Sequence, residues 1–267
     1  MTKTGNSAIF GGLLTVAVLL TAMASPQAGA QAPGNDPYAS WGRVLGKFVD
    51  DQGATDFHAL ENDRSDLDAF LDYIARVSPQ AAPDLFPTRE SRLAYYINAY
   101  NALAMHNVID SGIPDSLTGL SKVWFFGFKR FTVGGKKMSL YTLENDIIRP
   151  LGDERVHFAL NCMAAGCPRL PRVPFGADQI DRQLDAETRR FFSESRNLRV
   201  MPDERRVRVS SLLEFYTGDF LNKADSLIAY INQYVTQPIP VGYEIGFIDY
   251  DWTVNVQHRT PERRQLR

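Results

Sequence analysis

The residues best suited to chemistry lie together in one short stretch of the chain, residues 155–170. This stretch holds both cysteines of the chain, Cys162 and Cys167, and one of its four histidines, His157. A histidine beside a thiol can take the thiol proton and later return it, which is what a cysteine nucleophile requires. Two neighbouring cysteines can instead form a disulfide, and cysteine together with histidine can bind zinc. The stretch therefore predicts thiol catalysis, a disulfide, or a metal or redox site.

Thiol catalysis also needs a group that orients the histidine. The candidate bases are His157 and His106, and the candidate orienting groups are Glu144 and Asn161. With Cys162 or Cys167 as nucleophile, these residue types predict a cysteine-dependent hydrolase or acyl transferase. No papain-like or Ser-His-Asp signature accompanies them, so the substrate is not specified.

The spacing within the stretch favours one of the two cysteines. Large apolar side chains alternate along residues 156–160, which predicts a short, half-buried strand. The alternation places His157 and Asn161 together on the opposite face of that strand. Cys162 would begin on the apolar face, whereas Cys167 follows a loop of small residues that can turn back. We therefore favour Cys167 as the nucleophile.

The disulfide alternative rests on the even, minimal cysteine count of an exported chain. A turn can bring the Cα atoms of Cys162 and Cys167 to within about 6 Å of each other. So short a loop gains at most about 2–3 kcal/mol of stability, so the disulfide would mainly fix the shape of a binding domain. A zinc site of His157, both cysteines and His106, or a redox pair, would have unfamiliar spacing. We therefore predict no metal and no cofactor.

The clearest predicted helix begins near Thr88 and carries unusual polar residues on its apolar face. Asn98 and Asn101 are three positions apart, so both project from one side of this helix. They are predicted to form a buried hydrogen-bond network that fixes a neighbouring loop. The alternative is that they help to line the site, together with His106. Arg149 and Arg169 complete the candidate binding residues.

Helical and extended patterns are intermixed along the rest of the chain. Apolar spacing predicts helices over residues 38–50, 64–77, 140–149 and 178–194 and further short helices after Ser210. Two hairpins are predicted, one within residues 124–140 around Gly134-Gly135 and one around Pro202-Asp203, followed by an extended aromatic segment at 246–252. Because no regular βαβ repetition appears, we expect a single α+β domain of mixed helices with short antiparallel strands and hairpins.

The N-terminal segment has the features of a targeting signal. Lys3, an apolar run over residues 9–23 and the small residues of Ala28-Gly29-Ala30 predict a signal peptide, 1–30, that is cleaved before Gln31. A linker (31–36), one domain (37–258) and a basic tail (259–267) follow. We therefore expect an exported protein, periplasmic or secreted, with no stable membrane span after cleavage.

Composition limits the class of partner. Hydrophobic residues make up 44% of the chain, and the formal net charge is −2. There is no basic stripe or glycine-rich phosphate loop, which excludes nucleic acid as an expected partner. The expected ligand is a small molecule or a peptide whose identity the sequence does not specify.

Several of these segments match a known family in the order in which they occur. The chain resembles the domain-of-unknown-function 547 family through residues 96–103 (YINAYNAL), 139–145 (SLYTLEN), 148–149, 155–162 (RVHFALNC), 167–168 and 250–252. One position departs from the pattern, since some members carry histidine where this chain has Asn145. The resemblance implies kinship over most of the mature chain but no established activity. If that histidine has a functional role in those members, His157 or His106 would perform that role in this chain.

Overall fold

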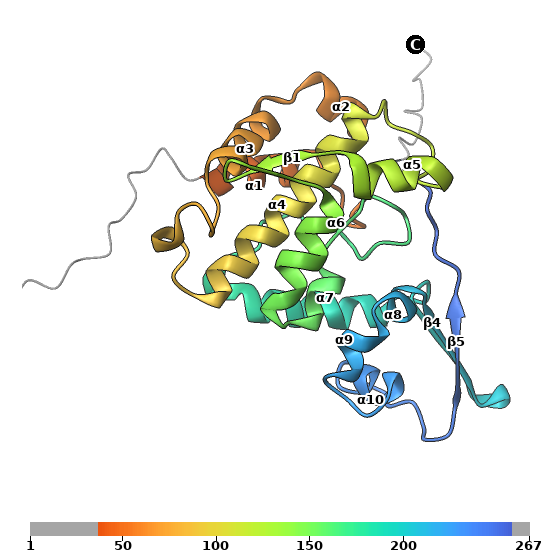
Figure 1. Cartoon of the computed structure of the whole chain (residues 1–267). Coiled ribbons are helices and arrows are strands. Elements are labelled where there is room, and N and C mark those ends of the chain that lie inside the picture. The colour runs from red at the N-terminus through yellow and green to blue at the C-terminus, as the bar shows by residue number, and fades with distance from the viewer. Residues whose placement is uncertain (1–36, 258–267) are drawn as a thin grey trace, which may run out of the picture. The chain divides into compact units, whose positions relative to one another are not determined.

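The longest element of the computed structural model is the helix α4 (Arg89–Asp110), shown in yellow in Figure 1. The structure describes residues 37–257. The helix begins at Thr88, whose hydroxyl accepts a hydrogen bond from the Ser91 N–H, while the Ser91 hydroxyl accepts one from the Thr88 N–H. Nearly all its residues from Leu93 to Ile109 are buried, because other helices cover it on several sides.

The remaining helices are short, and several contain 3-10 or π turns. The other α-helices are α1 (Pro37–Phe48), α2 (Phe57–Asn62), α3 (Ser65–Arg76), α5 (Gly119–Val123), α6 (Leu140–Thr142), α7 (Ile180–Ser193), α8 (Leu212–Phe215), α9 (Thr217–Leu221) and α10 (Leu227–Ile231). The π-helices are η2 (Trp124–Phe128) and η3 (Leu143–Ile148), and the 3-10 helices are η1 (Pro83–Leu85), η4 (Arg149–Leu151), η5 (Glu154–Phe158), η6 (Ala177–Gln179) and η7 (Pro202–Glu204).

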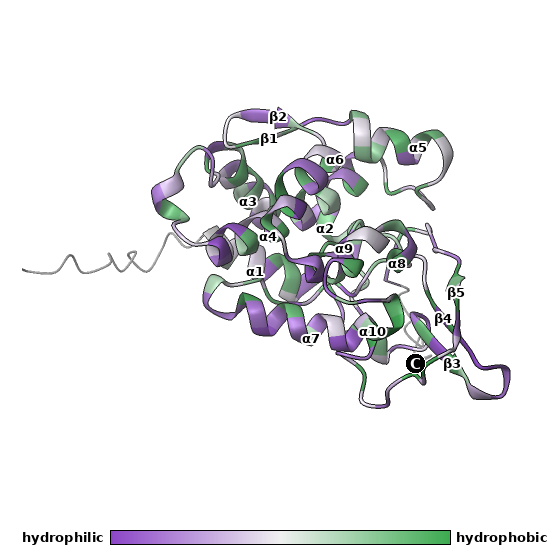
Figure 2. Cartoon of the chain, turned by 60° about the horizontal axis from the view of Figure 1, so that its bottom comes forward, coloured by the Kyte–Doolittle hydropathy of each residue, from purple (hydrophilic) through white to green (hydrophobic). Residues whose placement is uncertain are grey.

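Buried apolar side chains form two main clusters. The larger one joins α1, α3 and α4, and in it the Trp41 ring stacks on Phe70 with centroids 5.5 Å apart. The smaller one is centred on Phe158, which contacts the rings of Phe191 and Phe220. The helix α7 carries both polar and apolar residues along its length, as an amphipathic helix at the edge of a core should (Figure 2).

Two small sheets complete the fold. The hairpin of β1 (Phe131–Val133) and β2 (Lys136–Met138) turns at Gly134-Gly135, where both glycines have positive φ. β3 (Leu198–Met201) and β4 (Arg206–Ser210) pair antiparallel, and β5 (Glu244–Ile248) then pairs in parallel with β4. Both predicted hairpins are therefore confirmed, and the domain is α+β as expected.

The predicted strand over residues 156–160 is wrong. The chain forms the 3-10 helix η5 there, capped by Asp153, whose carboxylate accepts a hydrogen bond from the Arg155 N–H. The apolar alternation has another cause, because Val156 packs into the larger cluster and Phe158 into the smaller one. His157 and Asn161 therefore do not share a strand face.

Two other local predictions also need correction. Residues 124–128 form the π-helix η2 and not the start of the first hairpin. The helix predicted over residues 140–149 is a series of short α, π and 3-10 turns, and the last of them includes Pro150.

Some predictions concern parts of the chain that the structure does not describe. The predicted signal peptide (1–30), linker (31–36) and basic tail (259–267) lie outside residues 37–257. Among the described helices, none combines the length and the apolar character that crossing a bilayer requires.

Candidate functional site

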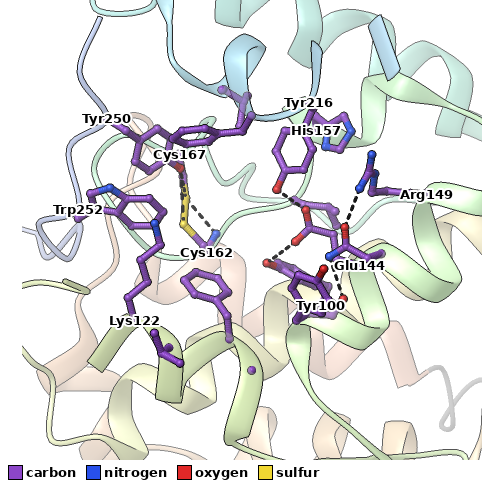
Figure 3. A pocket seen from close by; sticks show the side chains of 18 residues that line it. Tyr100, Lys122, Glu144, Arg149, His157, Cys162, Cys167, Tyr216, Tyr250 and Trp252 are labelled. Carbon is purple, nitrogen blue, oxygen red and sulfur yellow. Dashed lines mark hydrogen bonds between the residues drawn. A yellow bond between two sulfur atoms is a disulfide. The ribbon is translucent and has the colours of Figure 1, made fainter. Parts of the chain in front are cut away.

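A pocket of about 510 Å³ lies between α4, η3, the cysteine loop and the C-terminal segment (Figure 3). One side of it is formed by Cys162, Cys167, Tyr250 and Trp252, with Lys122 close to Trp252. The other side is formed by Tyr100, Glu144, Arg149, His157 and Tyr216. The structure thus brings five of the predicted site residues together: both cysteines, His157, Glu144 and Arg149.

Glu144 is the buried carboxylate of this pocket, with only 7% of its surface exposed. It lies on η3, which follows the short helix α6 capped by the Ser139 hydroxyl. Its Oε2 accepts a hydrogen bond of 3.0 Å from the Tyr100 hydroxyl, and its Oε1 accepts one from the Tyr216 hydroxyl. Burial, followed by the charge of Glu144, raises the pKa of both phenols far above the usual value, so they remain neutral donors.

His157 is held by a second carboxylate, Asp219 of α9. The Nε2 atom of His157 lies 2.8 Å from Asp219 Oδ2, and its ring stacks on Tyr216 with centroids 3.7 Å apart. Arg149 donates to both oxygens of Asp219, at 2.8 and 2.9 Å. Hydrogen bonds from His157 and then from Arg149 lower the pKa of Asp219 well below its usual range. The imidazole is therefore fixed in place by an ionised carboxylate.

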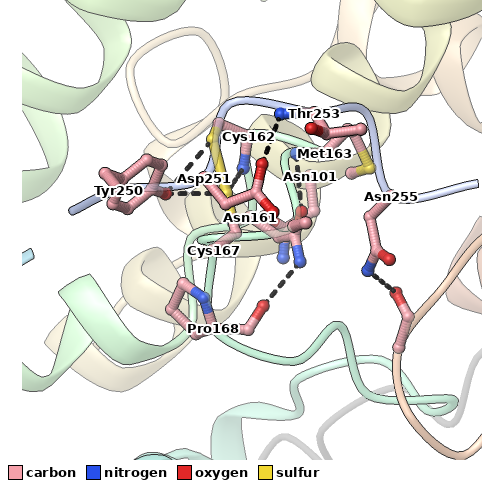
Figure 4. Close-up of a disulfide and its surroundings, with 12 residues drawn as sticks. Asn101, Asn161, Cys162, Met163, Cys167, Pro168, Tyr250, Asp251, Thr253 and Asn255 are labelled. Carbon is pink, nitrogen blue, oxygen red and sulfur yellow. Dashed lines mark hydrogen bonds between the residues drawn. A yellow bond between two sulfur atoms is a disulfide. The ribbon is translucent and has the colours of Figure 1, made fainter. Parts of the chain in front are cut away.

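The two cysteines form a disulfide on the opposite side of the pocket (Figure 4). Their Cα atoms are 6.3 Å apart, and five positions separate them in the sequence. The Cys167 sulfur accepts hydrogen bonds from the Cys162 N–H at 3.0 Å and from the Tyr250 hydroxyl at 3.1 Å. Tyr250 is a donor because burial, followed by the charge of Glu144, raises the pKa of its phenol above the usual value.

Two buried asparagines hold the loop that carries these cysteines. Asn101 of α4 accepts from the Asn161 N–H at 2.8 Å and donates to the Ala159 carbonyl at 3.0 Å. The Asn161 side chain donates to the Pro168 carbonyl at 2.7 Å and accepts from the Met163 N–H at 2.6 Å. Asn101 therefore belongs to a network that fixes a neighbouring loop, as predicted, and the Asn161 amide bonds to backbone groups of the cysteine loop.

The structure brings three other predicted residues to different places. His106 contacts Arg64 at 3.0 Å and the Phe131 ring, and burial followed by Arg64 lowers the pKa of its imidazole. Asn98 bonds to both backbone groups of Phe175 and not to the cysteine loop, and Arg169 pairs with Glu187. None of the three lines the pocket described above.

Tyr216, which lines the pocket, and Asp219, which lies behind His157, have no local sequence signal that would reveal them. Asp219 lies 62 positions from His157, and Tyr216 lies 72 positions from Glu144. Tyr250 and Trp252 are different, because both belong to the closing motif of the family resemblance. Within residues 37–257 no three His, Cys, Asp or Glu side chains are grouped so that they could hold a metal ion, which leaves the zinc alternative without a ligand set.

Comparisons with known proteins identify a family but no activity. No curated protein and no solved structure matches the chain. A family model described as "Protein of unknown function, DUF547" matches residues 85–192. This span includes α4, Glu144, His157 and both cysteines, whereas Tyr216, Asp219, Tyr250 and Trp252 lie beyond it. The chain therefore carries a DUF547 domain over residues 85–192.

Proposed function

We propose that this domain binds a small zwitterionic ligand, such as an amino acid or a short peptide, in the disulfide-braced pocket. The observation that carries the proposal is a pair of opposite charges in the pocket wall. Among the ion pairs of residues 37–257, neither Glu144 nor Lys122 has an oppositely charged partner. The two side chains lie on different sides of the pocket (Figure 3). A ligand with an ammonium at one end and a carboxylate at the other complements both.

The environment of each charge supports this orientation of the ligand. The Glu144 carboxylate is bonded by two neutral phenols, which fix its position without neutralising its charge. The Lys122 ammonium lies 3.5 Å from the centroid of the Trp252 ring, and burial lowers the pKa of that ammonium. A ligand carboxylate at Lys122 and a ligand ammonium at Glu144 would each replace lost hydration with a charge-assisted hydrogen bond.

The space between the two charges suits the apolar body of such a ligand. Aromatic rings of Phe126, Phe215 and Tyr250 line it, and its volume of about 510 Å³ falls within the usual range for small-molecule sites. The disulfide closes a loop too short to contribute more than about 2–3 kcal/mol through chain entropy. Its proposed task is to keep one wall of the pocket rigid, in the oxidising exported location that the N-terminal sequence predicts.

The test is calorimetric titration with leucyl-leucine and two blocked forms of it, N-acetylated and C-amidated. We expect the unblocked dipeptide to bind at least about tenfold more tightly than either blocked form, because each block removes one charged contact. Glu144→Gln should abolish the discrimination against the N-acetyl form, and Lys122→Met the discrimination against the C-amide. Glu214→Gln, an exposed carboxylate on α8, is the matched control and should change neither ratio. Blocked and unblocked forms that bind equally well, or do not bind, would refute the zwitterion proposal.

A second candidate function is thiol catalysis at Cys167, as a hydrolase or acyl transferase acting on the bound ligand. It is favoured by the two donors at the Cys167 sulfur, which would stabilise a thiolate there once the disulfide is reduced. The thiolate would attack an acyl carbon and expel the leaving group to form a thioester, which water or an acceptor then cleaves. In this mechanism the oxidised form is inactive.

Alkylation by iodoacetamide, followed by mass spectrometry, separates the two candidates. The binding proposal expects no alkylation before reduction and ligand binding by the oxidised protein. The catalytic candidate expects fast alkylation of Cys167 near neutral pH after mild reduction, and a slower reaction of Cys167 in Tyr250→Phe. A Cys167 thiol that reacts no faster than an ordinary thiol would remove the catalytic candidate and leave the binding proposal intact.

A further inference from the structure

The segment that forms one wall of the pocket also presents an apolar surface to the outside. Four large side chains of α5 and η2 are exposed within nine positions: Leu120 by 88%, Val123 by 51%, Trp124 by 58% and Phe128 by 62%. We refer to these four as the 119–128 surface. The Trp124 and Phe128 rings stack with centroids 6.1 Å apart, so the exposed aromatic area is continuous. So dense a group of exposed apolar side chains marks a docking site.

The segment that carries this surface has charges of one sign, and the exposed Asp115 precedes it. Between Ser116 and Leu143 the chain contains no Asp or Glu and five basic residues: Lys122, Lys129, Arg130, Lys136 and Lys137. Lys129 pairs with Asp110, whereas Arg130, Lys136 and Lys137 are exposed to solvent. The β1–β2 hairpin and α5 both lie along the upper edge of the domain in Figure 2. Arg130 and Lys137 therefore add exposed positive charge to the segment that follows the exposed apolar residues, whereas Lys136 lies at the hairpin turn next to Gln80.

We propose that the 119–128 surface docks the domain onto an anionic lipid bilayer. Exposed Trp, Phe and Leu side chains insert at the level of the headgroups, and flanking Lys and Arg residues bind anionic lipid phosphates. The segment lies in the plane of the membrane and does not cross it, which agrees with the lack of a spanning helix among the described residues. The charge complementarity selects an anionic membrane as the partner, because a purely apolar interface would not need basic residues along its edge.

Docking would bring the pocket next to the lipid. Val123 borders both the pocket and the shallow groove beneath the exposed side chains, while Phe126 and Gly127 of the same segment line the pocket alone. Residues 123–127 therefore lie between the pocket and the 119–128 surface. The surface proposal does not depend on the identity of the pocket ligand, so each can fail without the other.

The experiment is co-sedimentation with sonicated vesicles, using the chain from Gln31 onward, which retains every described helix and strand. We expect binding to vesicles of phosphatidylcholine with one-third phosphatidylglycerol, and much weaker binding to pure phosphatidylcholine. The double variant Leu120→Ser/Trp124→Ser should lower the partition coefficient at least about tenfold, because two apolar side chains no longer insert. Arg130→Glu/Lys137→Glu should lower it by a similar factor, and only on anionic vesicles.

Matched variants elsewhere on the domain show whether the effect is local. Leu85→Ser/Val241→Ser removes two side chains that are 59% and 97% exposed, and Arg182→Glu/Arg199→Glu reverses two exposed charges away from the surface. Both controls should bind vesicles as the unmodified protein does. The proposal is overturned if the unmodified protein stays in the supernatant, as a surface built for a protein partner would require. It is equally overturned if the controls lose as much binding as the surface variants, or if uncharged vesicles bind equally well.

Discussion

Replacing Asp219 by Asn should destabilise the domain, because this carboxylate joins His157 and Arg149 at the pocket. The substitution conserves shape but removes the charge that accepts one hydrogen bond from His157 and two from Arg149. The side chains of His157, Asp219 and Arg149 are 1%, 25% and 31% exposed, so the network is only partly screened by water. We expect a loss of about 2 to 3 kcal/mol, less than for a fully buried pair.

The effect should depend on pH in a direction set by the lowered pKa of Asp219. A carboxyl group with a folded-state pKa below the ordinary value of 3.8 contributes stability that is fully present above that value. This contribution is lost only as the pH falls below it towards the folded-state pKa. The part of the difference in unfolding free energy that comes from the Asp219 charge should therefore be fully present at pH 5 and shrink below about pH 4.

Urea unfolding followed by circular dichroism measures this difference, and a thermal melt should show a Tm lower by about 5 to 10 °C. Asp146→Asn is the matched control, because Asp146 is an exposed carboxylate on η3, and it should change stability by less than about 0.5 kcal/mol. If Asp219→Asn also stays within about 0.5 kcal/mol at pH 7, or if its effect grows as the pH falls, the network does not stabilise the fold as described.

Three further predictions concern the loop that carries the cysteines. Asn101→Leu leaves the Asn161 N–H and the Ala159 carbonyl without a hydrogen-bond partner in the core. It should lower the unfolding free energy, measured by urea titration, by about 2 to 4 kcal/mol, and an effect under about 1 kcal/mol would contradict this prediction. Gly166→Ala places a Cβ within 2.8 Å of the Asp251 backbone and should weaken ligand binding in the calorimetric titration, with unchanged affinity as the contrary result. Replacing both Cys162 and Cys167 by Ser should lower the unfolding free energy by only about 2 kcal/mol, because the loop that the disulfide closes is short. The measurement is made without reductant, and a loss above about 5 kcal/mol would show that loop entropy does not account for the stabilisation.

A sequence signal predicts a helix or a turn reliably where the same residues also form that helix end or that turn. Thr88 starts α4 through its own side chain, and Gly134-Gly135 turns the first hairpin because both residues adopt positive φ. Residues 156–160 were predicted wrongly because alternation of apolar residues does not reveal what each one packs against. Here alternate residues face two separate apolar clusters, a tertiary arrangement that a pattern of period two cannot distinguish from one sheet face.

The candidate site was predictable to the extent that its residues carry distinctive chemistry. The side-chain chemistry of Cys167, His157 and Glu144 predicts a common site, and the structure brings all three to one pocket. Asp219 could not be found in this way, because an acidic residue on a short helix resembles any solvated position until the fold brings it to His157. Only its residue type indicates a role for His106, whose position on α4 brings its ring to Arg64 and not to the pocket.

The pocket depends on a contact between the family-matched region and the C-terminal segment. The N–H groups of Ala165 and Gly166 donate to the carbonyls of Thr253 and Asp251, at 2.7 and 2.8 Å, so residues 250–253 run against the cysteine loop. This pairing fixes Tyr250 against the Cys167 sulfur, and a Cβ at position 166 would have no room. Residues 85–192 therefore supply both charged groups, the disulfide and the Phe126 ring, while the C-terminal segment supplies the Tyr250 and Trp252 rings. Selection of the charged ends of a ligand should consequently reside in Glu144 and Lys122 of the matched region, while residues 212–252 contribute to selection of its apolar body.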